Sequence, residues 1–239
     1  MHLLDLSFKT PEENLACDEA LLDLCEEGNG LEVLRFWESG VYFAVLGYSN
    51  KARVETHFEN CTKDKIPVFR RASGGGTVLQ GPGCLNYSLI LKIPQTGPLT
   101  NLTKTNASIL EKHCEALNPL LGGKIVVSGI SDLSLGSLKF SGNAQRRKKN
   151  ALLFHGTFLY DFNLEKIERW LAFPSKQPDY RKSRVHLDFV TNINLKPEQI
   201  KKSLREIWKA DGNLKKFPEV EMEKLIEEKY SQDEWNLKY

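Results

Sequence analysis

The sequence predicts an α+β fold, in which a mixed or antiparallel β-sheet is flanked by helices. Short segments with the alternating pattern of strands occupy residues 31–46, 66–91 and 124–162. Segments with helical spacing and capping signals lie between and after them. No internal repeat, low-complexity tract or linker divides the 239 residues, so we expect a single domain spanning 1–239.

The composition is that of a soluble globular protein. Apolar residues make up 41% of the chain, and 33 Lys and Arg against 31 Asp and Glu give a net charge of +2, which provides no general attraction to nucleic acid. We find no signal peptide and no transmembrane stretch. The five cysteines are scattered without a CxxC pair, as in a reducing compartment. We expect a cytoplasmic protein that binds neither nucleic acid nor a membrane.

The first helix is expected to begin at Thr10, with Pro11 in its first turn and Glu13 closing a capping box. It should end near Gly28 and Gly30. Its expected core-facing residues are Leu15, Leu21, Leu22 and Cys25.

Residues 31–37 and 41–46 are predicted to be two strands around a turn at 38–40. A polar run at 50–65 then leads to the most informative stretch, 66–91, which predicts a strand, a glycine turn and a strand. In its second strand one face is expected to carry Leu85, Tyr87, Leu89 and Leu91, and the other Asn86, Ser88 and Ile90.

Five glycines fall within ten residues of this stretch, at positions 74, 75, 76, 81 and 83. Such density indicates backbone with positive φ or a close approach to another group. With Arg70 and Arg71 just before it, the turn is a candidate site for a phosphate or a carboxylate. A plain hairpin is the alternative, because the loop lacks the Gly-Lys-Ser/Thr ending of a P-loop.

A second helix is expected to begin at Thr103 or Asn106 and to stop at Pro119 and Gly122–Gly123. Short antiparallel strands should follow over 124–162, with turns at 136–137 and 148–150. Helices are predicted at 164–171, 197–210 and 219–229, and an irregular loop at 174–182.

Three local patterns occur in a fixed order and together resemble one family. They are Arg-Arg-Ala-Ser-Gly-Gly-Gly-Thr-Val at 70–78, Ser-Leu-Lys-Phe-Ser-Gly-Asn-Ala-Gln at 137–145 and His-Gly-Thr-Phe-Leu at 155–159. Residues 14–22, 130–133 and 190–193 add support. The chain resembles the biotin/lipoate A/B protein ligase family, and within it the catalytic domain of lipoate–protein ligase A.

The resemblance implies an enzyme that uses ATP and Mg²⁺ to activate lipoate or octanoate as an acyl-adenylate. The acyl group would then pass to a lysine of a lipoyl carrier domain, in the E2 component of a 2-oxoacid dehydrogenase or in the glycine cleavage H protein. The small C-terminal domain of longer ligases is expected to be absent, because the chain ends at Tyr239, and a separate accessory subunit is a possible partner.

The resemblance also implies roles for particular residues. Lys139 would be the catalytic residue and would contact both the phosphate and the carboxylate, since fixed positive charge stabilises the charge that develops in phosphoryl transfer. Asp132 would help to hold Mg²⁺ or adenine. The residues expected to bind substrate or nucleotide are Arg71, Ser73, Gly74, Gly75, Gly76, Thr77, Val78, Leu79, Asp132, Gly142, Asn143, His155, Gly156 and Thr157.

Cys84 leaves a second function open. Residues 80–84 look like the corresponding loop of lipoyl(octanoyl) transferases, and a thiolate there could act as the nucleophile of an ATP-independent octanoyltransferase. The alternative to a catalytic Cys84 is a structural cysteine with a small buried side chain. Acyltransferases of this superfamily place their cysteine elsewhere, at positions where this chain has none. A third possibility is a protein that binds the acyl group or the adenylate without transferring it.

His155 could act as a base, but support of the pocket floor is the stronger expectation. The basic run at 146–149 is either a solvated hairpin tip or a docking site for an acidic carrier domain. Arg181, Arg184 and His186 form a charged cluster without a recognisable pattern.

Overall fold

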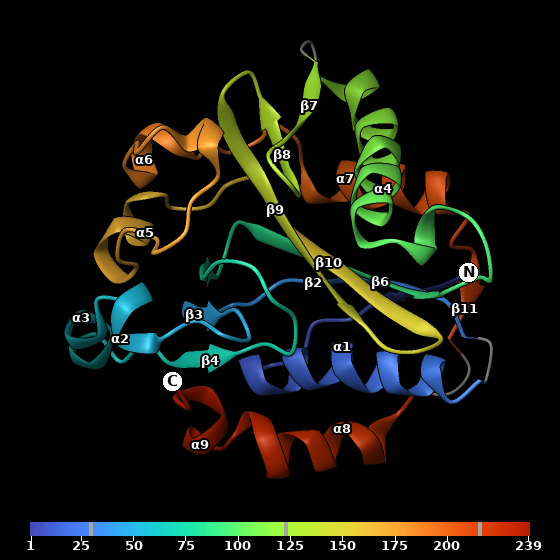
Figure 1. The fold of residues 1–239 in the computed structure, drawn as a ribbon, viewed down its shortest axis with the longest axis horizontal. Coiled ribbons are helices and arrows are strands. Elements are labelled where there is room, and N and C mark those ends of the chain that lie inside the picture. Colours follow the sequence, from blue (N-terminus) through green and yellow to red (C-terminus); the bar gives the residue numbers. More distant parts are fainter. Residues whose placement is uncertain (29–30, 122–123, 215–216) are drawn as a thin grey trace.

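The computed structural model describes residues 1–28, 31–121, 124–214 and 217–239. Within these residues the chain forms two β-sheets and the helices that cover them (Figure 1). The α+β class with mixed sheets and flanking helices is therefore confirmed.

The larger sheet is mixed. Its first three strands pair in parallel, and the other neighbours pair antiparallel. In the order in which they lie, its strands are β11 (Gly212–Asn213), β1 (His2–Asp5), β2 (Val33–Trp37), β6 (Cys84–Lys92), β10 (Ala151–Leu159), β9 (Leu138–Arg147), β8 (Asp132–Leu135) and β7 (Ile125–Ser128). The smaller sheet has the order β4 (Val68–Arg70), β3 (Phe43–Leu46), β5 (Val78–Gln80).

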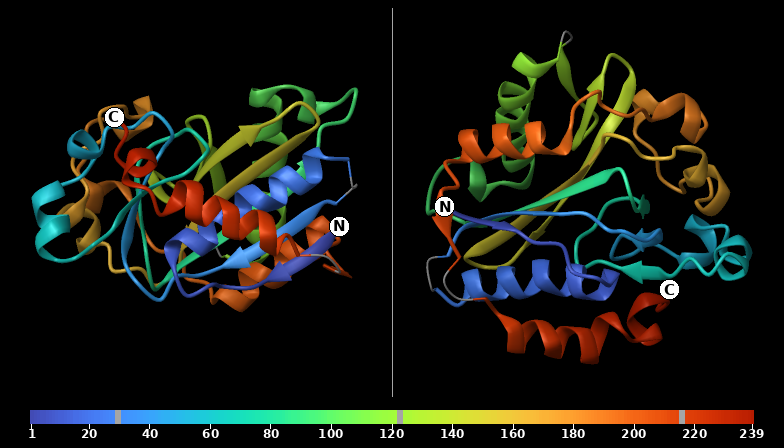
Figure 2. Two further views of the ribbon diagram at one scale, coloured as in Figure 1. Left: turned by 90° about the horizontal axis from the view of Figure 1, so that it is seen from below. Right: turned by 180° about the vertical axis from the view of Figure 1, so that it is seen from behind.

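The helices of the described residues lie on both faces of these sheets (Figures 1 and 2). They are α1 (Pro11–Glu26), α2 (Ala52–Glu55), α3 (Phe58–Lys63), α4 (Leu102–Leu117), α5 (Glu165–Trp170), α6 (His186–Phe189), α7 (Pro197–Trp208), α8 (Glu219–Leu225) and α9 (Asp233–Asn236). The short turns are the 3₁₀ segments η1 (Pro98–Thr100), η2 (Asn118–Leu120) and η3 (Asp179–Arg181) and the π turn η4 (Ile226–Tyr230).

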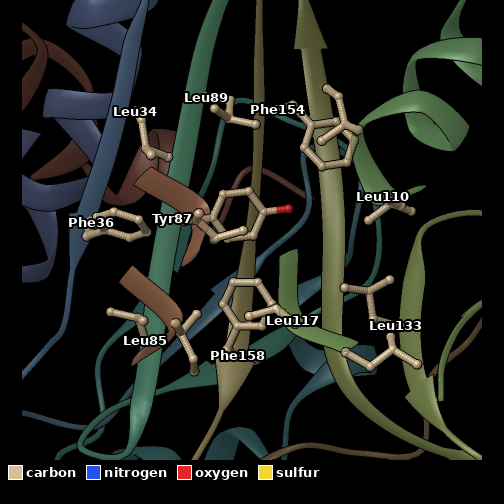
Figure 3. Close-up of a cluster of buried hydrophobic side chains, with 14 of the residues drawn as sticks. Leu34, Phe36, Leu85, Tyr87, Leu89, Leu110, Leu117, Leu133, Phe154 and Phe158 are labelled. Carbon is tan, nitrogen blue, oxygen red and sulfur yellow. The ribbon is translucent and has the colours of Figure 1, made fainter. Parts of the chain in front are cut away.

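Both faces of the large sheet are covered. Helix α1 packs against one face with α8 on its outer side, and α4 and α7 pack against the other (Figure 1). The predicted alternation in β6 is confirmed on the second face, where Leu85, Tyr87 and Leu89 join the aromatic core that Figure 3 shows with Phe154 and Phe158. The side chains of Asn86 and Ser88 point to the α1 side and are buried as well. Both faces of β6 are therefore buried.

The predicted start of the first helix is confirmed in detail. The Thr10 hydroxyl accepts the Glu13 N–H and the Glu13 carboxylate accepts the Thr10 N–H, so both bonds of the capping box are present. The Leu135–Leu138 pairing leaves Gly136 and Ser137 as a two-residue turn, with φ of +58° at Gly136. Of the predicted helix ends, Gly30 and Gly122–Gly123 lie outside the described residues.

The glycine stretch was expected to be one hairpin, and this expectation is wrong. Strands β4 and β5 both pair with β3 in the small sheet, whereas β6 belongs to the large one. The strands predicted at 31–37 and 41–46 do not pair either, since β2 and β3 lie in different sheets. The polar run at 50–65 contains α2 and α3. Gly74, Gly75 and Gly76 therefore lie in the connection between two strands of the small sheet, whereas Gly81 and Gly83 connect the two sheets.

Candidate active site

A cavity of about 420 Å³ lies where the two sheets meet. Its wall comes from the β4–β5 loop, β6, the β7–β8 turn, β9, β10 and the segment 174–190. A volume of this order is typical of small-molecule sites. The cavity is the candidate active site because most residues predicted to bind ligand line it.

The glycine loop supplies backbone donors to this cavity. The N–H groups of Gly75, Gly76 and Thr77 donate no hydrogen bond within the described chain, although all three residues line the cavity. Gly75 has a φ of +90°. Gly47 allows the loop to lie close, because a Cβ on Gly47 would lie 2.1 Å from the Gly75 carbonyl oxygen. Unpaired amides in a glycine turn form the kind of nest that binds anions.

Arg71 holds this loop in place. Its Nε donates to Ser73 Oγ at 3.0 Å, and its Nη2 donates to the carbonyl oxygens of Gly74 at 2.6 Å and Gly76 at 2.8 Å. Burial lowers the pKa of the guanidinium to about 10, so it stays charged at neutral pH. Arg71 therefore shapes the loop through hydrogen bonds and contributes positive charge from behind it.

Arg70 has a different role from the one that its position beside the glycines indicated. Its guanidinium donates to backbone carbonyls on both sides: Gly47, Tyr48 and Asn50 on one, and Trp235 and Asn236 on the other. Arg70 is fully buried and is not part of the cavity wall. The expectation that Arg70 and Arg71 together hold an anion is therefore corrected, because Arg70 is a structural link.

Lys139 lies on β9 in the cavity wall, with a quarter of its side chain exposed. Its Nζ is 2.8 Å from Asp132 Oδ1, and Tyr180 donates to Asp132 Oδ2 at 2.7 Å. Asp132 is a partner that the sequence did not place beside Lys139. Gly142 leaves room for the amine, since a Cβ on Gly142 would lie 2.8 Å from Nζ. Lys139 is thus an oriented point charge at the cavity surface.

The residues present do not form a metal site of their own. Both oxygens of Asp132 are occupied by Lys139 and Tyr180, and Asp18, the other acid in the wall, is occupied by Arg35 and Ser88. In the described part of the chain no group of three or more His, Cys, Asp or Glu side chains is arranged to hold a metal. A Mg²⁺ ion would therefore take most of its ligands from substrate phosphates and water.

A buried polar network forms another part of the wall. Arg35 Nη1 contacts Asp18 Oδ1 at 2.5 Å, and Ser88 donates to Asp18 Oδ2 at 2.6 Å. His155 Nε2 is 2.6 Å from Ser73 Oγ, and its Nδ1 is 3.8 Å from Asp18 Oδ2. Burial lowers the pKa of His155 to about 4, although Asp18 opposes the shift. His155 is neutral at physiological pH and supports the glycine loop through Ser73.

Asn143, on β9, connects β6 and the β7–β8 turn through hydrogen bonds of its side chain. Its Oδ1 accepts the Tyr87 hydroxyl at 2.5 Å, and its Nδ2 donates to the Ser131 carbonyl at 2.7 Å. Gly156 opposite must lack a side chain, because a Cβ there would lie 1.8 Å from Asn143 Oδ1. Asn143 and Gly156 therefore act as a fitted pair across β9 and β10.

The rest of the wall is largely apolar. Some of these apolar wall residues belong to the hydrophobic cluster beneath α1, and the others belong to the hydrophobic cluster around the small sheet and α5. These wall residues are Leu15, Trp37, Val45 and Val78 in the first group and Leu79, Leu159, Ile167, Leu171 and Val190 in the second. An acyl chain can pack against either surface.

Cys84 lies behind the cavity wall, next to Gln80 and Thr157, which line it. It is completely buried, its thiol donates to Gln80 Oε1 at 3.3 Å, and it is not part of the wall. Burial raises the pKa of the thiol, and Glu38 raises it further. None of the cysteines in the described ranges lines the cavity. This environment favours the small buried side chain over the nucleophile.

The structure brings most of the predicted site residues together. Those in the cavity wall are Arg71, Gly75, Gly76, Thr77, Val78, Leu79, Asp132, Lys139, Gly142, Asn143, His155, Gly156 and Thr157. Ser73 and Gly74 are not part of the wall, but both accept hydrogen bonds from the Arg71 guanidinium. Asp18 and Arg181 also line the cavity but were not predicted as site residues. Asp18 lies in the supporting pattern at 14–22, whereas no pattern marks Arg181 in the segment 174–190.

Residues 10–206 match the family described as "Lipoyl protein ligase A/B catalytic domain". The chain is 32% identical over 162 residues to the probable lipoate-protein ligase A of Mycoplasma genitalium, covering 67% of this chain but 46% of that protein. It is 25% identical to the octanoyltransferase LipM of Halalkalibacterium halodurans, covering 98% of both. The chain thus spans less than half of the first relative and nearly all of the second.

Solved structures share the fold. A lipoate protein ligase from Thermoplasma acidophilum, described as bi-partite and studied with its E2 lipoyl domain, superposes with a TM-score of 0.83 at 23% identity, covering 99% of this chain and 95% of that one. A lipoate-protein ligase A bound with ATP gives a TM-score of 0.78 at 24% identity, covering 99% and 98%. This chain belongs to the lipoyl protein ligase A/B catalytic domain family, as its motifs indicated.

Proposed function

We propose that this chain activates lipoate or octanoate with ATP and transfers the acyl group to a lysine of a lipoyl carrier domain. The observation that carries the proposal is the cavity itself, where the unpaired amides of the glycine loop, Lys139 and apolar walls meet. The name of the Mycoplasma genitalium relative supports a ligase, and the ATP-bound neighbour supports nucleotide binding by this fold.

In the first step a carboxylate oxygen of the acid forms a bond to the α-phosphorus of ATP, and the bond to pyrophosphate breaks. Both reactants are anions, so Lys139 and the amides of Gly75 and Gly76 would stabilise the approach and the charge on the phosphoryl oxygens. Asp132 and Tyr180 orient the Lys139 amine for this role.

In the second step the carrier lysine nitrogen attacks the acyl carbon, the bond to AMP breaks, and the amine loses a proton as the amide forms. His155 is buried, neutral and hydrogen-bonded to Ser73, so it supports the pocket floor in this scheme. The carrier is proposed to be a lipoyl domain of an E2 component or an H protein, and the bi-partite Thermoplasma ligase makes a separate small chain a candidate partner.

One observation favours a second candidate. The Halalkalibacterium relative that matches over 98% of both chains is named an octanoyltransferase. An ATP-independent transferase is therefore the alternative, with the acyl group taken from an acyl carrier donor. Cys84 is completely buried behind the cavity wall, which does not favour a covalent intermediate on that residue.

The test is to measure the intact mass of a carrier domain after incubation under two conditions. One mixture contains lipoate or octanoate with MgATP, and the other contains an octanoyl-acyl carrier donor without nucleotide. We expect modification only in the first, loss of it in Lys139→Met, and no change in Cys84→Ser. Lys202→Met, at an exposed lysine, is the matched control.

Modification from the acyl carrier donor without nucleotide would establish the transferase instead, and its loss in Cys84→Ser would identify that thiol as the nucleophile. Ligand-induced thermal stabilisation without any change in carrier mass, even with an accessory chain present, would indicate a binding protein.

A further inference from the structure

Arg181 is a buried arginine that forms part of the cavity wall. It ends the 3₁₀ turn η3, and only 4% of the residue is exposed. Its guanidinium carbon lies 5.0 Å from the ring centroid of Phe173 and 4.7 Å from that of Phe189. Two aromatic side chains therefore fix the position of this charge in the wall.

The guanidinium of Arg181 is left largely unpaired. Its Nε donates to the Arg184 carbonyl at 2.9 Å, but Nη2 is buried without a partner and Nη1 has no hydrogen bond within the described residues. No carboxylate of the described chain pairs with it, and its charged neighbour is another cation, Arg184. A buried charge without a counter-ion destabilises a protein, so its retention calls for a ligand.

The other cations of the wall are engaged or solvated. Lys139 is paired with Asp132, Arg71 donates to the carbonyls of its own loop, and Lys176 is exposed. Since Arg35 neutralises Asp18, the wall has surplus positive charge at Arg71, Lys176 and Arg181. Of these, Arg181 has the free donors of a planar fork, whose geometry suits phosphate oxygens.

The neighbouring residue connects Arg181 to the reacting end of the cavity. The Tyr180 hydroxyl donates to Asp132, which in turn holds the Lys139 amine. We propose that Arg181 binds the phosphate groups of the nucleotide and adds its counter-charge to that of Lys139. This inference rests on the proposed adenylation, and it assigns a binding role to a residue that lies outside the family-like motifs.

The experiment measures the affinity of the full chain for MgATP, sodium pyrophosphate and lipoate by calorimetry, together with melting temperatures. In Arg181→Met we expect affinity for ATP and pyrophosphate to fall by about tenfold or more, the loss expected for charge-assisted hydrogen bonds. Lipoate affinity should not change. The unliganded variant should melt at the wild-type temperature or above it, because an unpaired buried charge is removed.

Two further variants separate binding from structure. Lys182 is an exposed neighbouring cation that does not line the cavity, so Lys182→Met should retain the affinity for ATP. Arg181→Lys keeps the charge without the fork, and its ATP affinity should lie between those of the wild type and Arg181→Met. If Arg181→Met does not fold, Arg181→Lys alone must show the selective loss.

Four results would overturn the inference. They are unchanged ATP affinity in the Arg181 variants, an equal loss of lipoate affinity, an equal loss of ATP affinity in Lys182→Met, and a wild type that binds neither phosphate ligand. Carrier acylation, measured in parallel, tests the proposed function separately. Nucleotide binding that depends on Arg181 without ATP-dependent acylation would leave the inference standing and reject the function. ATP-dependent acylation together with unchanged ATP affinity in the Arg181 variants would reject the inference and leave the function standing.

Discussion

His113 shows at the scale of one residue how burial fixes a protonation state. The ring is fully buried between Tyr87 and Phe158, and its Nε2 accepts the Trp208 Nε1–H at 3.1 Å. Burial lowers the pKa of His113 to about 3, with a smaller contribution from Lys112. Since its pKa in the unfolded chain is about 6.5, only the unfolded state binds a proton in the interval between these values.

The contribution of His113 to the free energy of unfolding should therefore increase with pH between about 3 and 6.5, and be lost as the pH decreases through this window. One proton difference corresponds to about 1.4 kcal/mol per pH unit. His113→Gln removes the titrating ring but leaves an acceptor for Trp208. The free energy of unfolding, measured with urea at pH 4.5 and 5.5, should increase with pH in this variant by about 1.4 kcal/mol per unit less than in the wild type. An unchanged slope would mean that His113 is not the neutral core residue described.

Some residues of the candidate site could be predicted from the sequence and others could not. Lys139, Arg71 and His155 stand in local patterns whose order is informative, and the cavity brings them together. Arg181 lies in an irregular segment, and its proposed role depends on an Nη2 group without a hydrogen-bond partner and on the packing of Phe173 and Phe189. Both are visible only in the folded chain. Asp132 became the partner of Lys139 through β8–β9 pairing, a contact that sequence spacing did not indicate.

Among the elements, α9 is tied to the cavity through Arg70. The Asn236 side chain accepts the Arg70 backbone N–H at 3.0 Å, and the Arg70 guanidinium donates to carbonyls of α9 and of the loop that follows β3. That loop contains Gly47, which touches the glycine loop at Gly75. Arg70 therefore couples the last helix to the backbone of the candidate site.

Arg70→Lys should destabilise the protein, because a lysine cannot satisfy carbonyls on both sides. Buried acceptors left without donors cost on the order of 3 kcal/mol in total. Urea unfolding measures the change, and Arg146→Lys at an exposed position is the matched control. Equal stability of the two variants would show that the link contributes nothing.

The four basic side chains at the tip of the β9–β10 hairpin differ in their contacts and exposure. Arg147 donates to Thr105 Oγ1 and to the Leu99 carbonyl, and Lys148 pairs with Asp23 at 2.5 Å. Arg146 and Lys149 are exposed. A docking role for this tip therefore falls to these two side chains.

If the proposed carrier docks there, Arg146→Ala combined with Lys149→Ala should slow acyl transfer about threefold to tenfold at low ionic strength, and less at high salt. Adenylate formation should be unaffected. Lys202→Ala with Lys224→Ala changes the net charge equally on exposed helix surfaces and serves as the control. Equal transfer rates in both double variants would reject docking at the tip.

Strand pairing explains the main difference between the expected and observed elements. The run from β4 through β6 has a hairpin pattern, but β4 pairs with β3 in parallel, and β6 inserts between β2 and β10. Local alternation indicates strands and their faces, whereas the choice of partner depends on contacts far apart in sequence. The helix ends were more predictable, because the capping box of α1 depends on residues 10–13 alone.

At the scale of the whole molecule, the candidate site belongs to neither sheet alone. Residues 75–79 extend from the small sheet, residues 139–144 and 155–157 lie on the large sheet, and residues 174–190 complete the wall. Within the described residues no helix combines the length and apolar character of a membrane span. Ligand binding in such a cavity stabilises all of the segments that contact the ligand, because opening any one of them breaks the complex.

Amide hydrogen exchange, measured by mass spectrometry with and without lipoate and MgATP, tests this arrangement. We expect slower exchange in residues 73–77 of the small-sheet side, in residues 139–144 of β9 and in residues 174–182 around Arg181. Helix α4 packs on the far face of the large sheet and contributes nothing to the wall, so its exchange should not change. Lipoate alone should protect less of the segment at 174–182 than the pair of ligands does, because that segment carries the proposed phosphate contact. Protection confined to β9 would mean that the small sheet does not take part in ligand binding, and the placement of the active site between the two sheets would then be wrong.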